Sequence, residues 1–225
     1  MSYAIIYDCD GTLIDSEHIA GSVCADALTS IGFPTTMEAF NARFNGIPVA
    51  ETWAILRAEL PVELPPGFND AINAEIQHRF ATELEPVAGV ADAIAAIGGL
   101  RAVASSTRLP VLTRNLEKTG LAPLFGPHIY SASQVARGKP APDVFLYAAS
   151  QIGADPARTI VIEDSVAGVT AGIRAGMTVI GFHGASNGIP ELDARLVAAG
   201  AVQVVAGMAD LPDAVESVWR SMGKR

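Results

Sequence analysis

The stretch Ala4-Ile5-Ile6-Tyr7-Asp8-Cys9-Asp10-Gly11-Thr12 decides how the rest of the chain is interpreted. Its first four residues form a short apolar run, which is typical of a strand buried on both faces of a parallel sheet. The run stops at Asp8, and a second carboxylate, Asp10, follows after one residue. The segment therefore predicts a core strand that presents two carboxylates at its carboxyl end.

The same apolar pattern recurs along the chain and alternates with segments of helical periodicity. Further strands are predicted at residues 101–104, 159–162 and 177–182. Helices are predicted at residues 90–97, 111–119, 143–152, 166–175 and 192–199. This alternation indicates βαβ units, so the expected fold class is α/β, with a doubly wound parallel sheet as a Rossmann-like core. Such sheets bind ligands beyond the carboxyl ends of their strands, where Asp8 and Asp10 are expected to lie.

Residues 16–85 interrupt the alternation. They predict several successive helices, at residues 16–31, 36–43, 49–60 and 68–83, with no convincing strand. Turn signals flank the segment at Asp15-Ser16 and at residues 85–89, which are candidates for a two-stranded hinge. We therefore expect a catalytic core made of residues 1–15 and 86–225, and an inserted helical cap domain made of residues 16–85.

The composition excludes several classes of protein. Of the 225 residues, 50% are hydrophobic and 17% are charged, which is typical of a chain with a sizeable core and not of intrinsic disorder. A formal net charge of −9, with no run of Lys or Arg, argues against nucleic-acid or membrane-surface binding. No apolar stretch approaches the roughly 18 residues of a membrane span. With only Cys9 and Cys24 and no basic, apolar leader, we expect a cytoplasmic protein with reduced thiols.

Asp8 and Asp10 suit metal-assisted phosphoryl transfer. Two carboxylates this close need a cation, and Mg²⁺ prefers oxygen ligands and is typically held by one or two carboxylates together with substrate phosphate. One carboxylate can attack phosphorus, while the other donates a proton to the leaving oxygen and later takes one from water. A solvated, Asp-rich turn is the structural alternative, and this short motif alone leaves the choice open.

Three further features favour the catalytic interpretation. Ser105 and Ser106 follow a predicted strand, where hydroxyl and backbone N–H groups can hold phosphate oxygens; helix capping is the alternative for Ser105. Lys139, one of three lysines in the chain, precedes a predicted helix, and an ordinary surface lysine is its alternative. Glu163 and Asp164 end an apolar strand, where Asp164 can ligate a metal or either acid can serve the next helix N-terminus. Together these residues provide the parts for phosphoryl transfer.

In their order along the chain, these motifs resemble the four motifs of the haloacid dehalogenase-like hydrolase superfamily. The resemblance covers essentially the whole chain. Residues 16–85 match the helical cap of the subgroup that contains β-phosphoglucomutase, phosphoglycolate phosphatase and bacterial sugar-phosphate phosphatases. The likeness implies that Asp8 becomes an aspartyl-phosphate, that Asp10 is the general acid and base, and that Lys139 bridges phosphate and Asp8.

The resemblance also implies a metal site and a phosphate site. The phosphoryl group would be bound by the Ser105 hydroxyl and the Ser106 backbone. Glu163 would be a secondary or water-mediated contact of the metal. The direct Mg²⁺ ligands would be the Asp8 carboxylate, the Asp10 backbone carbonyl and the Asp164 carboxylate.

The subgroups of this family differ in residues that this chain has or lacks. Dehalogenases attack carbon without Mg²⁺ and usually lack the second aspartate, so Asp10 favours phosphate chemistry. Phosphonoacetaldehyde hydrolases need a cap lysine for a Schiff base, and no lysine precedes Lys118. Mutases resembling β-phosphoglucomutase carry a cap arginine where this sequence has Val49 and a cap histidine where it has Ala20. Both departures weaken the mutase interpretation.

The expected specificity depends on few cap residues. The cap has Arg43, Arg57 and Arg79 as its permanent cations, which suits a sugar or polyol leaving group with one carboxylate at most better than a bisphosphate. Arg43, Asn45 and the motif-adjacent Arg108 are candidate substrate contacts, with an ordinary surface position as the alternative for each.

We therefore expect a Mg²⁺-dependent phosphomonoesterase that acts on a small sugar or sugar-acid phosphate through an aspartyl-phosphate. Its partner would be a small-molecule phosphate ester, and neither nucleic acid nor membrane. The chain would be a monomer or a weak homo-oligomer. The alternatives are a mutase resembling β-phosphoglucomutase, a phosphoglycolate phosphatase and a non-catalytic binding module.

Overall fold

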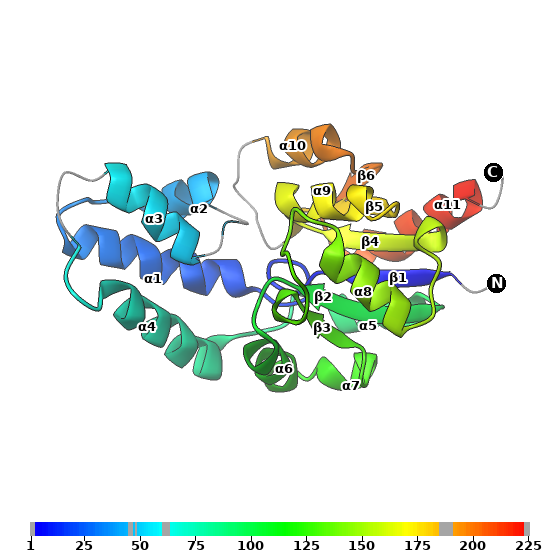
Figure 1. The fold of residues 1–225 in the computed structure, drawn as a ribbon, viewed down its shortest axis with the longest axis horizontal. Coiled ribbons are helices and arrows are strands. Elements are labelled where there is room, and N and C mark those ends of the chain that lie inside the picture. The colour runs from blue at the N-terminus through cyan, green and yellow to red at the C-terminus, as the bar shows by residue number, and fades with distance from the viewer. Residues whose placement is uncertain (1–2, 45–46, 48, 60–63, 185–190, 223–225) are drawn as a thin grey trace.

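A parallel sheet flanked by helices occupies one side of the molecule (Figure 1). The computed structural model describes residues 3–44, 47, 49–59, 64–184 and 191–222. Within that part of the chain the sheet has six strands in the order β3-β2-β1-β4-β5-β6, and all neighbouring strands are parallel. Strand β1 therefore lies at the position where the strand order reverses, which is the ligand-binding position of a doubly wound sheet. The strands are β1 (Ala4–Tyr7), β2 (Leu100–Ser105), β3 (Ile129–Ser131), β4 (Thr159–Glu163), β5 (Thr178–Phe182) and β6 (Gln203–Val205).

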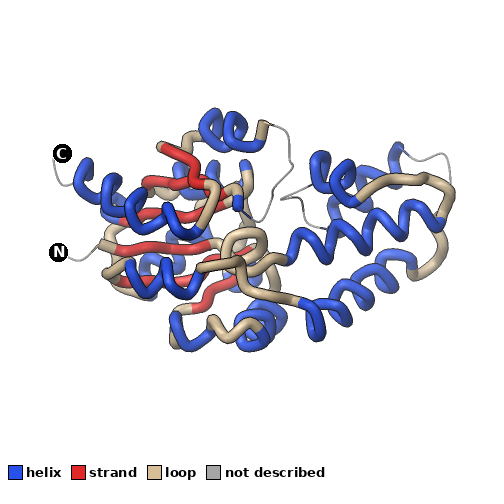
Figure 2. The backbone as a smooth tube through the Cα atoms, turned by 180° about the vertical axis from the view of Figure 1, so that it is seen from behind, coloured by secondary structure: helices blue, strands red, loops and turns tan. Residues whose placement is uncertain are grey.

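Helices cover both faces of the sheet (Figure 2). Alternate strand residues pack against the helices of opposite faces. Ile6 and Val161 belong to one buried cluster, together with residues of α8 (Asp143–Gln151), α9 (Val166–Arg174) and α10 (Leu192–Ala199). Ile5 and Tyr7 belong to the other, together with residues of α5 (Val90–Ala96), α6 (Leu109–Lys118), α7 (Ala122–Phe125) and α11 (Leu211–Met222). All of β1 is buried because successive side chains enter opposite layers. The predicted α/β fold with a doubly wound sheet is confirmed.

Four helices lie beyond the carboxyl ends of the strands and form the inserted cap (Figures 1 and 2). They are α1 (Ser16–Ser30), α2 (Met37–Phe44), α3 (Val49–Glu59) and α4 (Phe68–Glu83). The two connections to the core run side by side: Asp15 N donates to Glu85 O at 3.0 Å, and Val87 N donates to Leu13 O at 2.9 Å. The hinge expected at these residues is therefore a hydrogen-bonded pair of segments, while the domain bounds 15/16 and 85/86 stay a prediction.

The elements that sequence analysis did not predict are β3, β6, α7 and α11. The two strands have three residues each and lie at the edges of the sheet. Three residues are too few to show a periodicity, and these strands are ordered by pairing with β2 and β5. Helix α11 did carry a usable signal, because its buried residues Leu211, Ala214, Val215 and Val218 have helical spacing.

The buried apolar residues form two clusters, and the cluster that contains Ile5 and Tyr7 extends into the cap, where it includes Ile19 and Trp53. Cys9 and Cys24 are buried free thiols.

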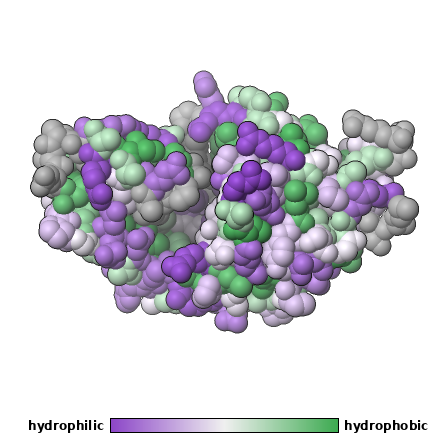
Figure 3. All heavy atoms as spheres, in the orientation of Figure 1, coloured by the Kyte–Doolittle hydropathy of each residue, from purple (hydrophilic) through white to green (hydrophobic). Residues whose placement is uncertain are grey.

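On the face drawn in Figure 3, hydrophilic and hydrophobic residues are interspersed over both the cap and the core. Among the described residues, no helix combines the length and the hydropathy needed to cross a membrane.

Candidate active site

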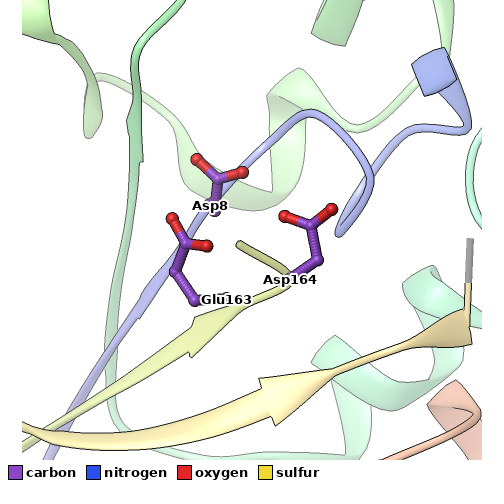
Figure 4. A group of neighbouring side chains, drawn as sticks. All are labelled: Asp8, Glu163 and Asp164. Carbon is purple, nitrogen blue, oxygen red and sulfur yellow. The ribbon is translucent and has the colours of Figure 1, made fainter. Parts of the chain in front are cut away.

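Three buried carboxylates converge beyond the ends of β1 and β4 (Figure 4). Asp8 follows β1, and Glu163 and Asp164 stand at the end of β4. Each offers one oxygen such that these atoms all lie within 4.8 Å of one another. The strand register explains the convergence: Tyr7 is aligned with Ile162, and Asp8 N donates to Ile162 O at 2.9 Å.

Two glycines make room for these carboxylates. A Cβ on Gly11 would lie 2.1 Å from Oδ2 of Asp164, and Gly11 has a φ of +78°, a region that favours glycine. A Cβ on Gly168 would lie 1.6 Å from Oε1 of Glu163. Both acids therefore occupy space that any larger residue at these positions would fill.

Lys139 is held between two of the acids. Its Nζ lies 2.5 Å from Oδ1 of Asp8 and 2.7 Å from Oε1 of Glu163, and its side chain is only 4% exposed. The other oxygen of Glu163 accepts hydrogen bonds from the backbone N–H of Ser165 at 2.8 Å and from its hydroxyl at 2.9 Å. Both oxygens of Glu163 are thus engaged, and this acid orients the lysine.

The electrostatics of this group follow from its burial. Burial raises the pKa of Asp8 to about 8; the Lys139 charge opposes this shift, and the Glu163 and Asp10 charges add to it. Burial also raises the pKa of Asp164 well above its ordinary value, with Glu163 and Asp8 adding to the shift. Burial alone would lower the pKa of Lys139, but the charges of Asp8 and Glu163 and their hydrogen bonds raise it on balance. The single positive charge of Lys139 thus does not fully compensate the negative charges of the buried carboxylates.

The donor set fits a hard divalent cation. Three carboxylates and one ammonium leave two negative charges when all are ionised, and every candidate ligand atom is an oxygen, as Mg²⁺ prefers. Asp8 and Asp164 would be the carboxylate ligands, since Glu163 is occupied with Lys139 and Ser165. Gly11 leaves the space that this arrangement needs.

Asp10 is oriented by the hydroxyl groups of Ser105, the last residue of β2, and of Thr107, which follows the strand. Its Oδ2 accepts hydrogen bonds from the Thr107 hydroxyl at 2.7 Å and from the Ser105 hydroxyl at 3.2 Å. Ser105 Oγ in turn accepts from the Thr107 N–H at 3.0 Å, and Thr107 O accepts from the Ser131 hydroxyl at 2.6 Å. Sequence analysis assigned no role to Thr107, because only the pairing of β1 with β2 brings it to Asp10. The Ser105 hydroxyl, expected to hold phosphate, is directed at Asp10 in this structure.

A cavity of about 640 Å³ lies between the core and the cap and contains most of the predicted site residues. Its lining residues on the core side include Asp8, Asp10, Ser106, Arg108, Lys139, Glu163 and Asp164. Ser105 is fully buried and does not line this cavity.

The two cap residues predicted to contact substrate have different outcomes. Arg43 forms an ion pair with Glu59 and lines a smaller adjoining cavity of about 340 Å³ instead. Asn45 lies outside the described residues.

The fold and the site define an α/β enzyme with its carboxylates at the switch point of a parallel sheet and a helical cap above them. Residues 4–176 match the family model of the haloacid dehalogenase-like hydrolases. The chain therefore belongs to the haloacid dehalogenase-like hydrolases, as the order of its motifs predicted, and the prediction of an enzyme of this family is confirmed.

Two relatives of the chain carry phosphatase names. It is 30% identical over 180 residues to the 6-phosphogluconate phosphatase of Escherichia coli K12, covering 80% of this chain and 81% of that one. It is 30% identical over 201 residues to the phosphorylated carbohydrates phosphatase of Thermotoga maritima, covering 87% and 92%. Among solved structures, a haloacid dehalogenase-like protein of unknown function from Agrobacterium tumefaciens matches with a TM-score of 0.91 and 37% identity, covering 97% and 99%.

Proposed function

We propose that the protein is a Mg²⁺-dependent phosphomonoesterase that hydrolyses a small sugar or sugar-acid phosphate through an aspartyl-phosphate on Asp8. The observation that carries the proposal is the position of Asp8: it lines the cavity, contacts Lys139 at 2.5 Å and belongs to the group of three carboxylates suited to Mg²⁺. The cavity volume of about 640 Å³ lies within the usual range of small-molecule sites.

In the first half of the reaction, a carboxylate oxygen of Asp8 attacks phosphorus. The bond between phosphorus and the ester oxygen breaks, and Asp10 donates its proton to that oxygen, so that the alcohol leaves. Thr107 and Ser105 hold the Asp10 carboxyl group in place for this transfer. Lys139 stabilises negative charge on the transferring phosphoryl oxygens and on Asp8. When bound, Mg²⁺ would supply further neutralisation of the phosphate charge.

In the second half, water attacks phosphorus and the bond between phosphorus and Asp8 breaks. Asp10, now a carboxylate, accepts a proton from that water. Inorganic phosphate leaves and Asp8 returns to its starting state. Movement of the cap about the paired connections at Asp15 and Glu85 would exclude water in the first half and admit it in the second.

The proposed substrate class is supported by the relatives and by the cap. Two relatives are named for phosphatase activity on 6-phosphogluconate and on phosphorylated carbohydrates. Among the described residues that line the cavity, the cations are Arg108 and Lys139, and both belong to the core. Ala20 lines the cavity on the cap side, at the position where mutases of the resembling type carry a histidine. The site thus favours an ester with one phosphate over a bisphosphate.

The proposal is tested by phosphate release from a panel of esters, with Mg²⁺ and with EDTA. The panel contains 6-phosphogluconate, fructose 1-phosphate, sorbitol 6-phosphate, phosphoglycolate and 4-nitrophenyl phosphate. We expect Mg²⁺-dependent release concentrated on the sugar and polyol esters, and no release by Asp8→Asn. If the wild-type protein releases no phosphate from any ester of the panel, the proposal is contradicted. Turnover by Asp8→Asn would exclude the covalent route.

A further inference from the structure

Glu17 is a cavity-lining acid that has no part in the mechanism above. It stands in the first turn of α1, and Ser16 and Ala20 on the same helix also line the cavity. The helix is fixed against α2, because the backbone carbonyl of Glu17 accepts a hydrogen bond from Asn41 Nδ2 at 3.2 Å. A Cβ on Gly21 would lie 2.1 Å from Oδ1 of Asn41, so the two helices approach closely at this point. Glu17 is therefore presented to the cavity by a well-supported helix.

The Glu17 carboxyl group is partly buried but has no protein partner in the described part of the chain. No hydrogen bond or ion pair to its oxygens occurs there, in contrast to Glu163, whose oxygens are both engaged. Burial raises the pKa of Glu17 to about 7, and the nearby charges of Asp10 and Asp15 add to the shift. Acidic residues do favour the first turn of a helix, but that preference needs no burial. The described part of the chain thus leaves a partly buried acid in a cleft without a hydrogen-bonding partner, which a bound ligand can supply.

The remaining cap wall of the cavity has both hydrogen-bonding and apolar residues, the apolar ones being Ile47, Ile76 and Phe80, and lacks a cation among its described residues. Glu51 of α3 and the amides Asn73 and Gln77 of α4 line it. The arginines of the cap lie elsewhere: Arg79 pairs with Glu83, and Arg43 pairs with Glu59. Arg57, the third, is exposed and does not line this cavity. The cap wall thus offers hydrogen-bond acceptors and amides beside apolar surface, and no cation among its described residues.

We propose that Glu17 is a specificity-determining residue that accepts hydrogen bonds from hydroxyl groups of the leaving alcohol. The site would thereby select phosphate esters of polyhydroxylated alcohols over esters whose alcohol lacks hydroxyls. The physical reason is that hydroxyl groups of the alcohol donate hydrogen bonds to the Glu17 carboxylate. An alcohol without hydroxyls excludes water from the carboxylate and offers it no donor. This inference rests on the proposed phosphatase function and specifies the substrate class of the same cavity.

The test compares sorbitol 6-phosphate with 4-nitrophenyl phosphate as substrates, with saturating Mg²⁺. We would measure kcat and KM for the wild-type protein, Glu17→Ala and Glu17→Gln. For Glu17→Ala, we expect the ratio of kcat/KM for the polyol ester to that for the aryl ester to fall about tenfold or more, as for loss of a charged hydrogen bond. Glu17→Gln should retain part of the preference, because its amide oxygen still accepts. Asp26→Asn removes an exposed charge from the same helix and is the matched control, expected to leave the ratio within twofold.

The outcomes separate this inference from the proposed function. A ratio within twofold of wild type in Glu17→Ala, with both esters still hydrolysed, would overturn the inference and leave the phosphatase proposal intact. Hydrolysis of the aryl ester alone by the wild-type protein would overturn the inference and the proposed sugar-ester specificity, while the phosphomonoesterase activity itself would stand. If the wild-type protein releases phosphate from none of the esters of the panel, both proposals fail. Circular dichroism of each variant separates a lost fold from a lost contact, and Glu17→Gln, which keeps side-chain volume, provides the readout if Glu17→Ala does not fold.

Discussion

Nζ of Lys139 lies 2.5 Å from Oδ1 of Asp8, although the two residues are 131 positions apart in the chain. The same Nζ contacts Glu163 at 2.7 Å, and none of the three side chains is more than 9% exposed. Removing one partner from a buried ion pair leaves an uncompensated charge. The lysine therefore determines the stability of this part of the fold as well as the charge of the site.

Lys139→Met should lower the free energy of unfolding by about 3–5 kcal/mol, because it leaves Asp8 and Glu163 buried without their cation. Urea unfolding at pH 8 in EDTA measures this change. Lys118→Met is the control, since Lys118 is exposed and its replacement removes the same charge, and we expect a change below about 1 kcal/mol. Equal losses in the two variants would show that the buried pair is not the cause.

Asp8→Asn should stabilise the metal-free protein increasingly as the pH rises. In the folded state the pKa of Asp8 is raised from 3.8 to about 8 by burial, so the folded protein binds this proton more tightly than the unfolded chain does. The contribution of Asp8 to stability in EDTA therefore falls as the pH rises from about 4 to about 8, and levels off above that range. The asparagine side chain of the variant does not ionise, so the variant lacks this loss.

The difference in Tm between Asp8→Asn and wild type, measured in EDTA at pH 5, 6.5 and 8, should thus increase with pH. Added Mg²⁺ should raise the Tm of the wild-type protein more than that of the variant, because the amide is the weaker ligand. A difference in Tm that does not depend on pH would contradict the raised pKa of Asp8.

Thr107→Val should lower kcat about tenfold or more, because the valine side chain is of similar size but cannot donate to Asp10 Oδ2. The pH dependence of kcat should shift as well, since the hydrogen bond acts on the group that exchanges protons with the leaving oxygen and water. Thr107→Ser keeps the hydroxyl and should restore most of the activity. Wild-type kcat in the valine variant would show that Thr107 does not orient Asp10.

Gly168→Ala should displace the Glu163 carboxylate, because the new Cβ would lie 1.6 Å from Oε1. We expect a loss of about 1–3 kcal/mol of stability from overpacking, together with lower activity as Lys139 loses its second partner. Gly98→Ala is the matched control: nothing lies within 4 Å of its Cβ position. Activity in Gly168→Ala equal to that of Gly98→Ala would show that Glu163 does not need its present position.

Most residues of the site could be predicted from the sequence because they stand at predicted strand ends or helix starts. Asp8, Lys139, Glu163 and Asp164 each stand at the end of an apolar strand or before a helix, and a parallel sheet brings such positions to one edge. Thr107 was missed because a hydroxyl in a Ser-Ser-Thr run has many ordinary roles. Its function as a donor to Asp10 depends on a contact between residues 97 positions apart.

The sequence by itself determined the alternation of strands and helices, the helical insertion and the order of the motifs, because these depend on local apolar periodicity and chain position. Only the tertiary structure decided which groups meet. It directs the Ser105 hydroxyl to Asp10 and pairs Arg43 with Glu59 away from the main cavity. It also places Glu17 in the cavity wall, where its carboxyl group has no partner among the described residues. These contacts depend on strand register and on the packing of the cap against the core. They join residues far apart in the chain, so they produce no periodic pattern in the sequence.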